Sequence, residues 1–130
     1  MNILANVYEA YEVHHLDHQV WNNQLNFYVD ELKIFETYLS KLVSNLSNRD
    51  LLAEVEHFQN QFIRQKEVLD QLKHDIKVNE QRLSKEIQNG FRMSDEDQKL
   101  HEKLREQVEI FDRIYKELKA EFQKFLLAAK

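Results

Sequence analysis

The sequence contains no cysteine, no proline and a single glycine, Gly90. Without cysteine, disulfide bonds, thiol catalysis and cysteine metal sites are all excluded. Proline breaks helix interiors and glycine weakens them, so their scarcity leaves few positions at which long helices would be interrupted. It also argues against a β fold rich in turns.

Other common signals are missing as well. No run of about 18 apolar residues is present to span a bilayer, and residues 1–6 lack the basic start of a signal peptide. The net charge is −5, and Lys and Arg form no basic stripe of the kind that binds nucleic acid or a membrane surface. We therefore expect a cytoplasmic protein with neither nucleic acid nor membrane as a partner.

What the sequence does contain is a regular helical pattern. Hydrophobic residues make up 42% of the 130 residues and charged residues 32%, which fits one domain, 1–130, with a core and a charged surface. Apolar residues recur at spacings of three and four along three stretches, the pattern of a helix that keeps one face (its seam) on a partner. This predicts an all-α protein with helices at about residues 3–46, 49–88 and 95–128. The first seam runs from Leu4 and Val7 to Leu46.

The predicted boundaries carry capping signals. Ser47 or Asn48 can cap the second helix, and Asn89-Gly90 can end it, because glycine readily adopts the left-handed conformation. Ser94 with Asp97 three residues later is a capping box for the third helix. Because both connections are short, consecutive helices must be antiparallel, giving an up-down-up bundle with coiled-coil-like seams.

Antiparallel pairing also predicts which residues share a level. Equal rise per residue brings residues of the first two helices together when their numbers sum to about 97, and those of the last two at about 183. Phe62 is then expected to face Phe35, and Phe58 to face Phe125. At the opposite end, His18 is expected at the level of Asn79.

Histidines occupy the seam itself at that end of the bundle. His14, His18 and Asn79 form a predicted polar core layer, with His101 close by. In one interpretation these groups satisfy one another and fix the register, as a buried Asn does in coiled coils. In the other, His14, His18 and His101 bind Zn²⁺ or iron, with Asp97 or Glu86 supplying an oxygen ligand.

Other chemistry finds little support. A di-iron centre needs two E-x-x-H motifs facing one point. The two motifs present, Glu12 to His15 and Glu54 to His57, belong to levels tens of ångströms apart, on the estimate of about 1.5 Å per residue. No serine has a histidine at its level to serve as a base. We therefore predict no catalytic residues and no enzymatic activity.

A second apolar stripe lies off the seam of the first helix. Its members recur at seven, seven and four residues: Val20, Phe27, Ile34 and Tyr38. Ile110 and Ile114 are similarly displaced on the third helix. Part of this pattern could widen the core, and the rest would be an exposed apolar patch of the kind that marks an interface. It predicts a homo-oligomer, with a C₂ dimer as the commonest form.

Two stretches resemble a group of small uncharacterised bacterial all-helical proteins. The first is His18-Gln19-Val20-Trp21 running into residues 27–31, and the second is residues 55–62 with residues 73–76. The resemblance implies an all-helical fold and brings no activity with it. The layout is also similar to a spectrin-type repeat, with Trp21 on the first helix, but fold does not carry function.

Together these features predict a non-enzymatic helical interaction or scaffold protein that self-associates and needs no cofactor. The alternative is a metal-binding bundle that holds zinc or iron in the histidine cluster.

Overall fold

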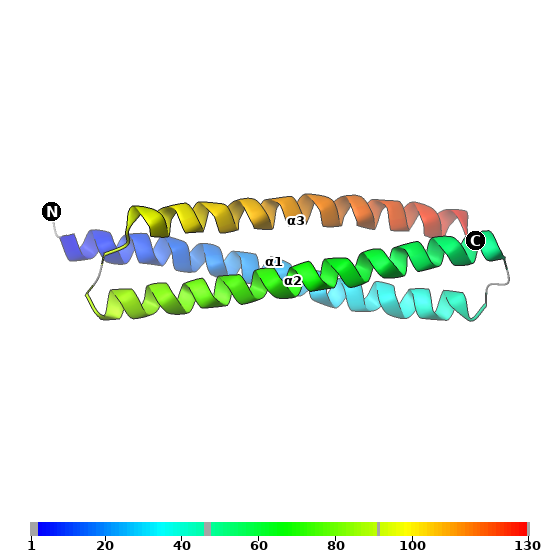
Figure 1. Ribbon diagram of the computed structural model, residues 1–130, viewed down its shortest axis with the longest axis horizontal. Coiled ribbons are helices and arrows are strands. Elements are labelled where there is room, and N and C mark those ends of the chain that lie inside the picture. Colours follow the sequence, from blue (N-terminus) through cyan, green and yellow to red (C-terminus); the bar gives the residue numbers. More distant parts are fainter. Residues whose placement is uncertain (1–2, 46–47, 91, 130) are drawn as a thin grey trace.

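The computed structural model describes residues 3–45, 48–90 and 92–129, with side chains from Ala10 onward. Three helices make up the fold: α1 (Ile3–Val43), α2 (Arg49–Gln88) and α3 (Asp95–Ala128). They lie lengthwise beside one another in an elongated bundle, with the start of α1 at one end and the end of α3 at the other (Figure 1). The predicted all-α, up-down-up architecture is confirmed.

The helix boundaries follow local hydrogen bonding. Asn48 caps α2 by accepting a bond from the Asp50 N–H at 2.9 Å, while the alternative cap, Ser47, lies outside the described residues. Gly90 follows the helix with a φ of 80°, the left-handed conformation that the sequence predicted. The predicted capping box at the start of α3 is also present, with Ser94 and Asp97 bonding to each other's backbone N–H groups.

The first helix is shorter than predicted. It ends at Val43, and the Ser44 hydroxyl and the Asn45 side-chain amide both donate to the Lys41 carbonyl of its last turn. Such local bonds compete with continued helix. Leu46 lies outside the described residues, and Leu4 and Val7 have no described side chains.

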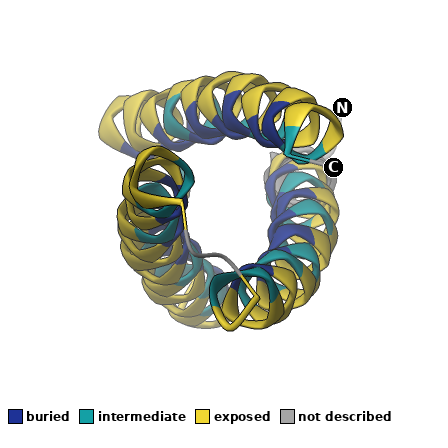
Figure 2. Ribbon diagram, turned by 90° about the vertical axis from the view of Figure 1, so that its right-hand side faces the viewer, coloured by how far each residue is buried: buried dark blue, intermediate teal, exposed yellow. Residues whose placement is uncertain are grey.

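The core lies along the inward faces of all three helices, which is where the buried residues gather in an end-on view (Figure 2). The predicted aromatic layers are confirmed: the rings of Phe35 and Phe62 are 5.7 Å apart and those of Phe58 and Phe125 are 5.2 Å apart. Phe122 contacts Phe35, Phe58 and Phe62 as well. The end of the bundle near the α1–α2 connection is therefore packed by aromatic rings.

A ladder of polar contacts joins the two parallel helices, α1 and α3. Asp112 accepts bonds from Gln24 and Tyr28, and Glu31 accepts from Tyr115 at 2.6 Å and from Lys119 at 2.8 Å. Partners are 84 or 88 residues apart in the sequence. These separations bracket the offset of about 86 that the level rule implies for equal helical rise. The ladder fixes the register of α3 against α1.

Candidate functional site

The histidine cluster lies at the end of the bundle where α1 begins, α2 ends and α3 begins (Figure 1). The rings of His14 and His101 stack with centroids 3.7 Å apart and planes 10° from parallel. The ring centroids of His18 and His101 are 5.4 Å apart, and the Nε2 of His18 is 3.5 Å from the amide nitrogen of Asn79. Each of these four residues is at most 7% exposed. The structure thus brings together the three seam histidines and the asparagine.

Each histidine uses one ring nitrogen to contact a polar residue just outside the seam. The Nε2 of His14 lies 3.0 Å from the Gln98 side-chain oxygen, the Nε2 of His101 lies 2.8 Å from Asp17, and the Nδ1 of His18 lies 2.5 Å from Glu80. Because a carboxylate only accepts, the nitrogens of His18 and His101 must carry the hydrogen. His18 is then the Nδ1–H tautomer, and its Nε2 can accept from Asn79.

Glu80 and Asp17 organise the rim of the cluster, and sequence reasoning missed both. Glu80 also accepts from the Tyr11 hydroxyl at 3.2 Å and contacts His15. Asp17 accepts from Arg105 at 2.9 Å, and the Arg105 guanidinium lies over the ring of Trp21. Their positions in the sequence could have indicated them, because Glu80 follows Asn79 directly and Asp17 is one turn after His14.

Burial favours the neutral forms of His14 and His18. It lowers the pKa of His14, and the neighbouring His101 lowers it further. Burial also lowers the pKa of His18, outweighing the contact with Glu80. For Glu80, burial raises the pKa, but bonds from His18 and His15 more than reverse that, so it ends below its ordinary value. The arrangement is neutral imidazoles facing an ionised carboxylate.

Two ring nitrogens remain without a partner. The Nδ1 atoms of His14 and His101 are buried and have no hydrogen-bond partner among the described residues. As each of these rings has its hydrogen on Nε2 when neutral, each Nδ1 presents a lone pair. A buried lone pair without a donor is costly, so both Nδ1 atoms are unsatisfied points of the cluster.

Asp97, the predicted oxygen ligand, is engaged elsewhere. It is 3% exposed, bonds to the Ser94 N–H at 2.9 Å and accepts from Arg82 at 2.5 Å. Burial raises its pKa, but the bonds from Ser94 and Arg82 outweigh that effect and hold it below the usual range. Glu86, the other oxygen ligand considered, accepts from the same arginine at 3.0 Å. Asp97 thus joins α3 to α2 through Arg82, while Glu86 pairs with the same arginine within α2.

The geometry also limits what a metal ion would find. Within the part of the chain that the structure describes, no three His, Asp or Glu side chains are arranged around one point to hold a metal. Zn²⁺ requires nitrogen lone pairs converging at about 2.0–2.1 Å. The rings of His14 and His101 lie face to face, so their lone pairs point along parallel planes. Binding one ion between them would require at least one ring to turn.

The second apolar stripe of α1 lies on the outside of the bundle. Val20 is 55% exposed, Phe27 58%, Ile34 66% and Tyr38 46%. Val13 and Leu16, which sequence reasoning did not include, are 57% and 59% exposed. Val13 extends the seven-residue spacing by one step before Val20. The exposed part of the pattern therefore covers most of α1, and we call these six residues the α1 stripe.

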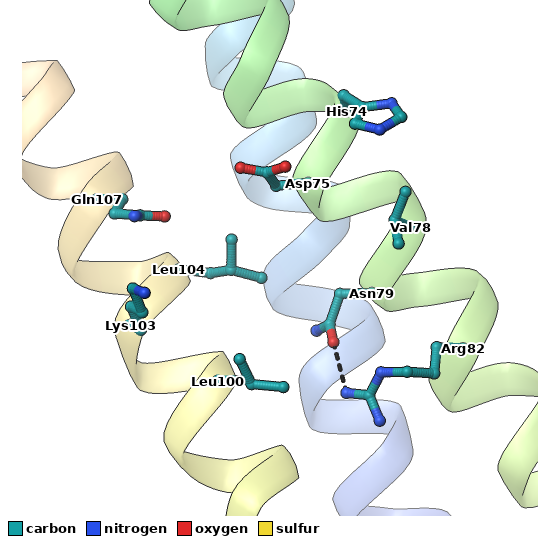
Figure 3. Close-up of a pocket in the computed structure, with 9 residues that line it drawn as sticks. All are labelled: His74, Asp75, Val78, Asn79, Arg82, Leu100, Lys103, Leu104 and Gln107. Atoms are coloured by element: carbon teal, nitrogen blue, oxygen red, sulfur yellow. Dashed lines mark hydrogen bonds between the residues drawn. The ribbon is translucent and has the colours of Figure 1, made fainter.

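A hollow of a different kind runs between α2 and α3. One segment of about 320 Å³ is lined by Val78, Asn79 and Arg82 of α2 and by Leu100, Lys103 and Leu104 of α3, with Leu100 and Leu104 directed toward α2 (Figure 3). A second segment of about 530 Å³ continues from it, because both include Asp75 and Gln107. We call the two segments the α2–α3 groove.

Comparison of the chain with protein-family models, with curated proteins and with solved structures gives no significant match. Across the described residues, no helix combines the length and apolar character needed to cross a bilayer.

Proposed function

We propose that this protein is a non-enzymatic helical interaction protein that self-associates through the α1 stripe. The observation that carries the proposal is the exposure of Val20, Phe27 and Ile34, each more than half exposed and each seven residues from the next. A seven-residue repeat keeps a line of side chains on one face of a helix over a long distance. Large exposed apolar patches are uncommon on monomers and usually mark an interface.

The packing of the bundle supports the same function. Other apolar residues of α1, among them Trp21, Leu25 and Leu32, are already buried in the core. The α1 stripe is consequently a second apolar face, beyond what this chain uses to fold. Leaving it in water gains nothing for the fold, whereas burying it contributes roughly 25 cal/mol per Å² of apolar surface.

The test replaces two residues of the α1 stripe by lysine. We expect Phe27→Lys with Ile34→Lys to be a folded monomer, because a charge at each site would have to be buried in the contact. Sedimentation velocity of the wild type and the variant measures the change in mass. A matched control, Ile63→Lys with Leu127→Lys, alters two equally exposed apolar residues outside the stripe. Unchanged association of the Phe27 and Ile34 variant would refute the proposal.

A metal-binding role for His14, His18 and His101, with Asp97, is the second candidate. The buried, unpartnered Nδ1 atoms of His14 and His101 favour it, since a metal ion is one partner that would satisfy such lone pairs. Elemental analysis of tag-free protein, normalised to chain concentration, tests it. Stoichiometric zinc or iron that is lost in His14→Ala would support this role, and a metal-free protein after incubation and desalting would reject it.

A further inference from the structure

The α2–α3 groove runs along the seam between α2 and α3. The backbones of α2 and α3 approach each other at fewer positions than those of α1 and α2. Between them, the buried side chains of Leu72 and Phe111 line the floor, and the half-exposed side chains of Val68, Ile110 and Ile114 line the walls. An apolar floor between two helical walls is the shape that accepts an amphipathic helix.

The groove and the α1 stripe match in length and repeat. Along α3, the groove residues Leu100, Gln107 and Ile114 are seven apart, as are Val13, Val20 and Phe27 of the α1 stripe. Both sets span about 21 Å at a rise of about 1.5 Å per residue. A helix laid along the groove could therefore place one stripe residue at each step.

Their charges are complementary. Apart from Arg82, whose charge is paired with Asp97 and Glu86, the groove is lined by Arg64 and Lys103 against one acidic residue, Asp75. In contrast, α1 has no Lys or Arg before Lys33, and the exposed Glu12 and Asp30 flank this part of the stripe. Opposite charges across an interface favour encounter and fix the register. An acidic helix with an apolar face is thus the partner that the groove fits, and this chain carries one.

We propose that the α2–α3 groove of one copy receives the Val13–Phe27 part of the α1 stripe of a second copy. This inference rests on the proposed self-association and specifies its counter-surface. The contact is heterologous, because the two surfaces differ, and a pair of copies retains one free groove and one free stripe. Such contacts propagate into rings or open chains instead of closing as a C₂ dimer.

The experiment uses two variants that each lack one surface. Val20→Lys with Phe27→Lys removes the stripe, and Ile110→Lys with Ile114→Lys removes the groove walls. The wild type should grow beyond two chains with rising concentration, and each variant alone should be monomeric. An equimolar mixture of the two should form a complex of twice the monomer mass, because each variant supplies the surface that the other lacks. Circular dichroism checks that both are helical, and Ile110→Ala with Ile114→Ala replaces the groove variant if it fails to fold.

The outcomes separate this inference from the proposed function. A groove variant that still associates like the wild type would overturn the inference and leave self-association through the stripe intact. Two monomeric variants that form no mixed complex would also overturn it. A wild type that is monomeric at every concentration would overturn both and leave the groove to a different protein partner.

Discussion

The two ends of the bundle are held together in different ways. At the end near the α1–α2 connection, Phe35, Phe58, Phe62, Phe122 and Phe125 pack ring against ring. At the other end, the same seam positions are occupied by histidines and an asparagine, each bonded to a polar side chain from another helix. One fold therefore contains an aromatic end and an end with a buried polar layer, along a single core.

The difference teaches what each kind of core contributes. Apolar packing is non-directional and stabilises in proportion to the area buried, so it gives the aromatic end most of its free energy. Hydrogen bonds between buried groups add about 1 kcal/mol each, but an unmatched group costs more than that. The histidine end is therefore weaker in net stability and stricter about register, and it responds to pH where the aromatic end does not.

Removing a ring from the aromatic end should produce the largest effect. Phe62 is fully buried, and its ring contacts three other phenylalanines, Phe35, Phe58 and Phe122. We expect Phe62→Ala to lower the free energy of unfolding by about 3–5 kcal/mol, because it leaves a cavity that the rigid helices cannot fill. Urea denaturation followed by circular dichroism measures this loss. A loss below about 1 kcal/mol would show that the aromatic end is not the main source of stability.

Acidification should weaken the histidine end selectively. Burial lowers the pKa of His14 and His18 in the folded chain, so the unfolded chain binds protons more readily. The stability that depends on neutral imidazoles is complete above the unfolded pKa of about 6.5 and is lost as the pH falls below it. Between pH 7.5 and pH 5.5 the preference of each histidine for its neutral form should lower the free energy of unfolding by at most about 1.4 kcal/mol.

The pH window separates the histidines from the carboxylates of the same end. Asp97 and Glu80 have lowered pKa values, so protonating them destabilises the fold only at more acidic pH, through the range where free carboxyls titrate. Denaturation at pH 7.5 and 5.5 should show a smaller difference in His18→Leu than in the wild type, while His74→Gln, a change of an exposed histidine, serves as control. An equal pH dependence in all three proteins would contradict a neutral histidine layer.

The two ends also differ in how much of them the sequence predicts. Seam spacing and equal rise are enough to pair Phe35 with Phe62 and His18 with Asn79, since both follow from backbone geometry alone. The partners of the histidines do not follow from it. Glu80, Asp17 and Gln98 lie beside the seam, and whether such long or mobile side chains turn inward depends on rotamers that spacing leaves open. The stacking of His14 on His101 is likewise a matter of side-chain angle.

The smallest expected effect comes from replacing one member of the histidine layer at neutral pH. His18→Leu removes the bond to Glu80 and the long contact of 3.5 Å from the Asn79 amide nitrogen. Glu80 keeps Tyr11 and His15 as partners and is partly exposed, and Asn79 keeps its bond from Arg82. A leucine of similar volume buries well at this 1% exposed site, so we expect the free energy of unfolding to change by less than about 1 kcal/mol. Urea denaturation at pH 7.5 measures this change in the free energy of unfolding, in parallel with metal content.

If His18 held a metal ion, the same substitution would release it and lower the melting temperature, because binding to the folded state adds directly to stability. If the wild type and His18→Leu instead melt at the same temperature and neither contains metal, His18 is a structural polar group of the core.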